Sequence, residues 1–381
     1  MPDAPPSLRA LIDVAVSLVR RTASGTVVLA RYEPLVDYDA LPAGIRDAVR
    51  DELQRARAAA LEPLDTKVVK KAAAGVDSVS EEPIAVTPTA QVHRAELDGE
   101  AVAVKVARPG LANTVRAELS LLDLLVAPLR MVFPRVDIGA ALSEVREGAM
   151  DELDLEHEGE TAHQVRRALG RTELDVVIPR VHLEESAPGV LVTEFLTGAS
   201  LAEALPEDAE AVARTLIATH LAVWREAGLV LTDCRPAHVL DLGGGRVGLL
   251  GTGLARPVPR ERLDAGLAAF LALRDEDPAR FVAAAAALEV VPEDALPEAH
   301  TLLREIFGEF AEGPATLDGP ALAAASERGF GRIRDLLRLG AGVRPAASDL
   351  AAVRMLGQLI ATLSNLGVRA DWFAVAEDAA A

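Results

Sequence analysis

Hydrophobic and polar positions alternate along two neighbouring stretches of the chain, residues 84–95 and 101–107. This alternation predicts two β-strands, each with one buried face. Between them stands Asp98-Gly99, a dipeptide that tolerates the positive φ angles of a tight turn. The pattern therefore predicts a β-hairpin.

Apolar positions spaced by three and four residues predict helices elsewhere. They fall at 7–21, 43–75, 111–127, 142–169, 199–204 and 207–227, and Pro63 interrupts the second of them. Short strands are predicted at 175–182, 189–195, 229–231, 239–241 and 246–250. From Arg260 onward the chain is rich in Ala and Leu, which predicts helices interrupted by prolines.

This order of elements predicts an α+β fold with four parts. They are a helical N-terminal extension (1–80), a small mixed lobe (81–193), a connecting and loop region (194–258) and a helical remainder (259–381).

Charge and composition narrow the choice of partners. The chain has 58 acidic and 39 basic residues, a formal net charge of −19, which disfavours nucleic acids and anionic lipid surfaces. The single cysteine, Cys234, excludes an intrachain disulfide and fits a reducing cytoplasm. We expect no secretory signal and no integral membrane span, since no apolar run reaches about 18 residues. Residues 7–21 are amphipathic with a basic end, so they either pack on the fold or contact a membrane peripherally.

The second predicted strand contains Val102-Ala103-Val104-Lys105, the pattern in which kinases carry the lysine that binds the α- and β-phosphates of ATP. The chain has only four lysines, and the other three are clustered at 67–71. The alternative is a strand-end lysine that extends to water.

Several neighbouring motifs resemble one family. Glu82-Pro83-Ile84-Ala85, the stretch from Ala90 to Ala95, the strand ending in Lys105, and Arg108-Pro109-Gly110 resemble the UbiB-type (AarF) atypical kinases, which are associated with isoprenoid-quinone metabolism. Further matches continue in order to about residue 258. The resemblance implies a protein-kinase-like bilobal fold with N- and C-terminal helical extensions.

On this resemblance, Glu158 is the ion-pair partner of Lys105, and Glu152 and Asp154 are the family's Glu-x-Asp motif. Glu152 and Glu156, like Asp154 and Glu158, stand four residues apart on the predicted helix. The alternative is a solvated acidic helix face. We expect Lys105 and Glu158 to lie within ion-pair distance.

The resemblance also implies a nucleotide-binding hinge at Glu194, Phe195 and Leu196. The loop that faces the phosphates in the family is altered here, because Pro88 removes a backbone amide. The hydroxyl groups of Thr87 and Thr89 are the remaining candidate phosphate contacts.

Asp233 matches the family's catalytic aspartate, whereas both metal positions depart from the family. His238 stands in place of the metal-binding Asn, and Gly251 in place of the metal-binding Asp. Glycine has no ligand atom in its side chain, and imidazole is a poor ligand for Mg²⁺. Glu152, Asp154 and His238 are the remaining candidate metal ligands.

These observations favour a kinase-fold pseudokinase that acts as a binding or regulatory module. It would bind ATP or another nucleotide, with Mg²⁺ left open, and its partner would be a protein or a lipid-pathway ligand. The alternative is an ATPase or a small-molecule or lipid kinase with unusual metal coordination. A third alternative is a kinase fold that carries out a different reaction, in which Asp233, His238 and Glu152 have other roles.

Overall fold

The computed structural model describes most of the chain from residue 61 onward. The described ranges are 61–117, 153–340 and 345–380, with Gln54, Leu119, Ser143, Arg146, Met150, Asp151 and Val343 as single positions. The predicted helix 7–21 lies outside these residues, as do most of the helix at 43–75 and the second half of that at 111–127. Residues 111–117 are helical, as predicted.

The described chain divides into two compact units. The first holds residues 61–119, 143–159 and 181–195, and the second holds 160–180 and 196–380.

The first unit is built on a five-stranded antiparallel sheet in the order β1–β3–β4–β6, with β2 also paired to β3. Its strands are β1 (Ser78–Val79), β2 (Ala85–Val86), β3 (Ala90–Leu97), β4 (Glu100–Ala107) and β6 (Val190–Glu194). The predicted hairpin is confirmed, with Asp98 and Gly99 at φ 51° and 80° between β3 and β4.

The prediction of one strand over 84–95 is wrong in one respect. The structure divides it into β2 and β3, which form a hairpin of their own around Pro88 and Thr89. Proline has no N–H to donate to a sheet ladder, and its fixed φ suits a turn.

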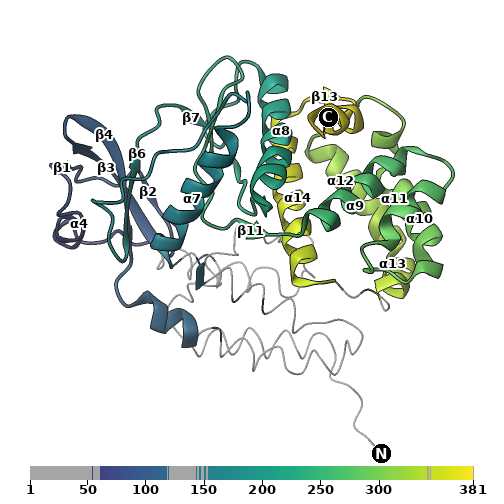
Figure 1. Cartoon of the computed structure of the whole chain (residues 1–381), viewed down its shortest axis with the longest axis horizontal. Coiled ribbons are helices and arrows are strands. Elements are labelled where there is room, and N and C mark those ends of the chain that lie inside the picture. The colour runs from purple at the N-terminus through teal and green to yellow at the C-terminus, as the bar shows by residue number, and fades with distance from the viewer. Residues whose placement is uncertain are drawn as a thin grey trace, which may run out of the picture. The chain divides into compact units, whose positions relative to one another are not determined.

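One face of the sheet carries the apolar core of the first unit. Val102, Val104 and Val106 alternate along β4 and are buried, and Val69 of helix α4 (Thr66–Ala72) belongs to the same buried cluster. Figure 1 shows α4 beside this sheet. Helix α4 begins after Asp65, whose carboxylate accepts a hydrogen bond from the Lys67 amide at 2.7 Å. Residues 61–65 are not helical, so the helical region predicted over 43–75 is interrupted around Pro63, as expected.

The second unit contains three small sheets. β5 (Val176–Val177), β10 (Val247–Leu249), β9 (Val239–Asp241) and β7 (Ala199–Ser200) form one sheet in that order. β8 (Leu229–Val230) pairs with β11 (Arg256–Pro257), and β12 (Ala315–Thr316) pairs with β13 (Arg369–Ala370). The predicted helix at 199–204 is wrong, because β7 pairs with β9 there and a turn follows.

Helices make up most of the second unit. They are α8 (Ala209–Ala227), α9 (Arg260–Leu271), α10 (Ala279–Ala286), α11 (Leu296–Ala311), α12 (Gly319–Gly331), α13 (Ile333–Gly340), α14 (Ala347–Leu366) and α15 (Trp372–Ala380), with 3₁₀ turns η2 (Pro236–His238), η3 (Ala272–Arg274) and η4 (Glu293–Ala295). Helix α8 is capped by the Asp208 carboxylate and ends at Gly228 in the left-handed conformation. It contacts both α14 and α15 (Figure 1).

The predicted helix at 142–169 is interrupted: the described residues Ser143, Arg146, Met150 and Asp151 are helical, as predicted, but Leu153 and Asp154 are not, and α7 (Leu155–Leu169) begins after them. Leu153 lies in a turn, and the Asp154 carboxylate accepts a hydrogen bond from the His157 amide at 3.0 Å, as an N-cap does. Asp154 and Glu158 are thus not two positions within one continuous helix, and the expected acidic stripe is wrong at this point.

No helix among residues 61–117, 153–340 and 345–380 is both long and apolar enough to cross a bilayer.

Candidate functional site

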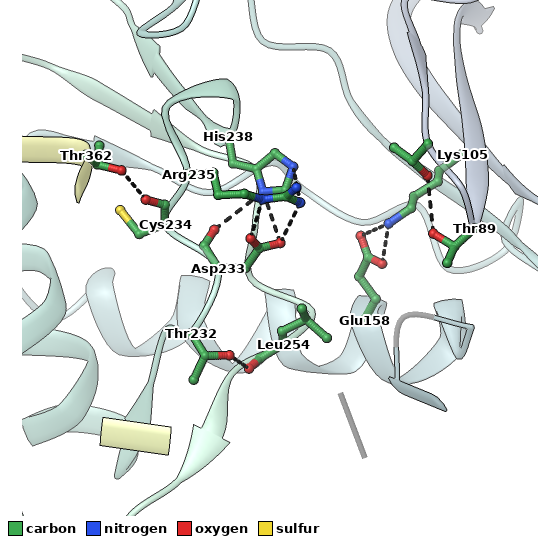
Figure 2. Close-up of polar contacts among 11 residues, drawn as sticks. Thr89, Lys105, Glu158, Thr232, Asp233, Cys234, Arg235, His238, Leu254 and Thr362 are labelled. Carbon is green, nitrogen blue, oxygen red and sulfur yellow. Dashed lines mark hydrogen bonds and ion pairs between the residues drawn. The ribbon is translucent and has the colours of Figure 1, made fainter. Parts of the chain in front are cut away.

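Lys105 lies on the face of β4 opposite to the valine core. It pairs in register with Val92 of β3 and Leu191 of β6. Its Nζ lies 2.6 Å from Glu158 Oε2 and 2.9 Å from Oε1, and the two side chains are 26% and 15% exposed (Figure 2). The expected ion pair is present, and its partial burial shields it from solvent screening.

The position of Glu158 follows from how α7 approaches the sheet. A Cβ on the next residue, Gly159, would lie 3.1 Å from Leu191 Cδ1 of β6. A larger residue here would require the Leu191 side chain to shift by a few tenths of an ångström, so glycine eases the close approach of α7 to the strand. The Asp154 cap fixes where the helix begins, so Glu158 falls in its first turn.

The turn between β2 and β3 is closed by side chains. Thr87 Oγ1 accepts a hydrogen bond from Ala90 N (2.9 Å), and Arg108 Nε donates to the Thr87 carbonyl (3.1 Å). The Thr87 and Thr89 hydroxyl oxygens lie 3.2 Å apart, and Thr89 is buried. Both hydroxyl groups are thus engaged within the turn.

The hinge residues occupy the end of β6 and the residues after it. Glu194 ends β6, and the Phe195 amide donates to the Ala101 carbonyl at 3.2 Å. The Arg94 guanidinium lies 4.8 Å from the centre of the Phe195 ring, so a cation covers one face of that ring. Leu196 belongs to the second unit, where its side chain contacts Gly248.

In the second unit, the loop between β8 and β9 carries the other predicted residues. Two hydroxyl groups hold its backbone: Thr232 donates to the Leu254 carbonyl, and Thr362 of α14 donates to the Cys234 carbonyl (Figure 2). We refer to residues 232–238 as the Asp233 loop.

The carboxylate of Asp233 is fully engaged within this loop. Arg235 Nε donates to Oδ1 at 2.6 Å and Arg235 Nη2 to Oδ2 at 3.1 Å, while His238 Nδ1 lies 3.2 Å from Oδ2 (Figure 2). Burial on its own raises the pKa of Asp233, but the His238 imidazole and the Arg235 guanidinium outweigh it and hold that pKa well below its usual range. A carboxylate held this way is a weak proton acceptor.

Gly251 passes directly over the Asp233 loop. A Cβ built on Gly251 would lie 2.3 Å from the Asp233 carbonyl oxygen and 2.7 Å from His238 Nδ1. Because real Cβ atoms do not approach other atoms this closely, the backbone at this position admits glycine alone without rearrangement.

Among the described residues, Asp154, His238 and Gly251 do not supply the oxygen ligands of the metal that the family resemblance implies. Asp154 caps α7, His238 contacts Asp233 and Arg235, and Gly251 leaves no room for a carboxylate. Glu152 lies outside the described residues. Among the residues that are described, no three His, Cys, Asp or Glu side chains gather into a set that could hold a metal ion.

Sequence reasoning missed Arg235 and Arg108. Arg235 stands two residues after Asp233, but whether its side chain turns back to the carboxylate depends on how the loop folds. Arg108 was noted only as part of Arg-Pro-Gly. The structure shows that it binds the 87–90 turn, and its Nη2 atom is buried without a hydrogen-bond partner in the described part of the chain.

A family model for the ABC1 atypical kinase-like domain matches residues 49–285. Since this match covers more than half of the chain, the chain belongs to the ABC1 atypical kinase-like family, which includes the AarF kinases. The predicted family and the protein-kinase-like α+β fold are thereby confirmed.

Curated relatives carry the same family name. Mouse AarF domain-containing protein kinase 1 is 30% identical over 199 residues, which cover 49% of this chain and 38% of the mouse protein. The Arabidopsis thaliana protein ACTIVITY OF BC1 COMPLEX KINASE 8, chloroplastic, is 27% identical over 270 residues, which cover 67% of this chain and 35% of the plant protein. The matched part thus spans little more than a third of these relatives.

Among solved structures, the Mycobacterium tuberculosis protein Rv3197, determined in complex with erythromycin, is similar with a TM-score of 0.64 at 20% identity. The match covers 97% of this chain and 95% of that one, which shows a shared fold.

Proposed function

We propose that this chain is a nucleotide-binding pseudokinase of the ABC1 family, a binding or regulatory module with little or no phosphoryl transfer. The observation that carries the proposal is the close passage of Gly251 over the Asp233 loop. Glycine at this position has no side chain to bind a metal ion, and the closely packed backbone leaves no space for a metal-binding side chain.

Nucleotide binding is supported by the Lys105–Glu158 ion pair. In kinases, the same kind of pair places the lysine on the α- and β-phosphates. The pair joins the middle strand of the sheet to the first turn of α7, so it is held by two rigid elements.

Weak catalysis is supported by the state of Asp233. Its two carboxylate oxygens are taken by Arg235 and His238, whereas a catalytic aspartate must accept or orient a substrate hydroxyl. A positioned metal contributes several kcal/mol to phosphoryl transfer. Its loss, at about 4 kcal/mol, lowers the rate roughly a thousandfold.

The experiment measures nucleotide binding and ATP turnover on the same protein. We expect ATP or ADP to raise the melting temperature, and Lys105→Ala to abolish that shift. Turnover with Mg²⁺ or Mn²⁺ should stay far below the roughly 1–100 s⁻¹ of active kinases. Turnover in that range that is lost in Asp233→Asn would refute the pseudokinase and favour the alternative, an ATPase or lipid kinase with unusual coordination.

The pathway and partner follow from the family alone. We propose a role beside isoprenoid-quinone or prenyl-lipid metabolism, exerted on a protein partner rather than a nucleic acid, in keeping with the charge of −19. Co-purification of the same protein partner with wild type, and its loss in Lys105→Ala, would support a nucleotide-dependent interaction.

A further inference from the structure

We propose that a groove between α8, α15 and the turn that follows α7 binds a short apolar peptide with a free amino end and a free carboxyl end. All of its lining residues belong to the second unit, and the site is separate from any nucleotide site. We refer to it as the α8–α15 groove. Its volume is about 500 Å³, within the roughly 300–1,000 Å³ of sites that bind small molecules.

The floor of the α8–α15 groove is apolar. Ala218 and Ala222 stand four residues apart on α8, so they share one face of that helix. Their side chains are small and leave space above the helix. Leu174, from the turn between α7 and β5, and Val375 of α15 supply apolar walls. This surface fits the aliphatic side chains of a ligand.

Two of the charged residues that line the groove are already neutralised. Arg214 Nε and Nη2 both contact Glu210 Oε1, at 3.1 and 3.0 Å. Glu226 Oε2 lies 3.2 Å from Arg171 Nη1. Neither residue needs an opposite charge from a ligand.

The other charged residues of the groove are not neutralised in this way. The carboxylates of Glu173 and Asp378 form no hydrogen bond or ion pair with any residue that the structure describes. Arg225 Nη2 donates to the Ala380 carbonyl, and the remaining N–H groups of this guanidinium have no partner in the described part of the chain. Asp378 and Ala380 lie in the same turn of α15, which brings Arg225 near Asp378. The groove therefore offers one cation and two carboxylates beside an apolar floor.

These charges determine the class of ligand. A guanidinium forms charge-assisted hydrogen bonds with a carboxylate, and a carboxylate forms them with an ammonium group. A ligand that is only an anion would be repelled by Glu173 and Asp378, and one that is only a cation would be repelled by Arg225. An apolar peptide of two or three residues carries one charge of each sign, together with aliphatic side chains for the floor.

The test measures the binding of three small peptides by calorimetry at neutral pH. They are leucyl-leucine, its N-acetyl derivative, which lacks the ammonium group, and its amide, which lacks the carboxylate. We expect leucyl-leucine to bind with a dissociation constant below roughly 1 mM. Each modified peptide should bind at least about tenfold more weakly, the effect of losing one charge-assisted hydrogen bond.

Two variants assign the two ends of the peptide. Arg225→Gln should weaken leucyl-leucine binding at least about tenfold and leave the affinity of the amide unchanged, because the amide has no carboxylate. Asp378→Asn should weaken leucyl-leucine binding at least about threefold, since Glu173 remains, and leave the affinity of the N-acetyl derivative unchanged. A merely structural effect would weaken all three peptides alike. The matched control is Glu377→Gln, which changes the neighbouring exposed carboxylate of α15 outside the groove and should leave all affinities unchanged.

A third variant tests the floor. Ala222→Leu places a larger side chain on the floor of the groove and should abolish the binding of all three peptides. Leucyl-leucine binding that Ala222→Leu leaves intact would place the peptide elsewhere and overturn the inference.

Three further results would overturn the inference. One is the absence of leucyl-leucine binding up to about 10 mM. Another is leucyl-leucine binding that neither Arg225→Gln nor Asp378→Asn changes. The last is equal binding of all three peptides, because the charges of the groove would then not select the ligand. If Arg225→Gln has a lowered melting temperature, Asp378→Asn decides in its place, since it leaves the contact between Arg225 and Ala380 intact.

Discussion

The thiol of Cys234 is enclosed between the Asp233 loop and α14. Cys234 is 4% exposed, and its own carbonyl accepts a hydrogen bond from Thr362. Burial, and after it the negative charge of Asp233, raise the pKa of this thiol to about 12. A reactive nucleophile needs the opposite shift, so Cys234 is a structural residue.

We predict that native Cys234 resists alkylation. At pH 8 the thiol stays protonated and enclosed, so iodoacetamide should modify it at least about a hundredfold more slowly in the native protein than in denaturant. Mass spectrometry of timed samples measures both rates. Rapid stoichiometric labelling of the native protein would show that the loop opens readily or that the thiol is activated.

His220 makes stability depend on pH. Burial within α8 lowers its pKa, and the Nδ1 hydrogen bond to the Leu216 carbonyl (2.8 Å) offsets this only in part. The folded state therefore binds fewer protons at this site than the unfolded state. The free energy of unfolding therefore has its full value, as far as His220 is concerned, above the pKa of an unfolded histidine, about 6.5. It falls as the pH drops below that value, because the unfolded state then binds a proton that the folded state does not.

We predict that His220 contributes up to about 1.4 kcal/mol of destabilisation between pH 7.5 and 5.5. Urea unfolding at both pH values measures this difference, which should shrink in His220→Leu. His163→Gln, a change at an exposed histidine of α7, is the matched control and should keep the wild-type difference. An undiminished difference in His220→Leu would assign the pH dependence to other groups.

At the scale of elements, the segment after β10 and the Asp233 loop fit each other only because position 251 is glycine. We predict that Gly251→Asp does not restore a metal site, because its Cβ would collide with main-chain and imidazole atoms. Forcing such a side chain into packed surroundings destabilises a protein by about 1–3 kcal/mol. The measurement is urea unfolding together with Mg²⁺-dependent ATP turnover.

The control is Gly266→Ala in α9, where a Cβ meets no atom within 4 Å. A glycine-to-alanine change in a helix should raise stability by roughly 0.5–1 kcal/mol. If Gly251→Asp were as stable as wild type and gained Mg²⁺-dependent ATP turnover, the prediction would be wrong, because the backbone at position 251 would then accept a metal-binding carboxylate.

The elements also show which features local sequence determines. The hairpin at Asp98-Gly99 and the start of α8 at Asp208 follow from residues next to each other, so the sequence predicts them well. The strand β7 is two residues long and exists because β9 pairs with it, which no local pattern records. The break before α7 was not predicted because the apolar spacing runs on through 142–169, whereas the Asp154 carboxylate caps a new helix there.

The candidate site also contains features that a sequence motif predicts and features that depend on contacts made only in the folded chain. Lys105 and Glu158 were predictable because a family motif carries each of them, and the structure pairs them. The engagement of Asp233 by Arg235 was not predictable, because it depends on how the loop folds back over two residues. The crowding at Gly251 was not predictable either, since it depends on main-chain atoms from another segment.

At the scale of the whole molecule, the chain combines an apolar interior poor in aromatics with a strongly acidic surface. Aromatics are 3% of residues, and the buried residues of the described part are mostly Ala, Leu and Val. The excess of 58 acidic over 39 basic residues gives the net charge of −19. Such a charge repels an anionic membrane over a distance that salt shortens.

We predict that the protein does not sediment with vesicles rich in phosphatidylglycerol at about 0.15 M salt, and binds them no better at about 0.01 M, where the Debye length is near 30 Å. The exception would come from residues 7–21, whose basic end, Arg20-Arg21, could draw an amphipathic helix to an anionic surface. Deletion of residues 1–21 tests that exception directly. Vesicle binding that strengthens at low salt and disappears with the deletion would mean that a local basic helix outweighs the net charge. Absence of binding in both proteins would mean that the net charge governs how the molecule meets a membrane.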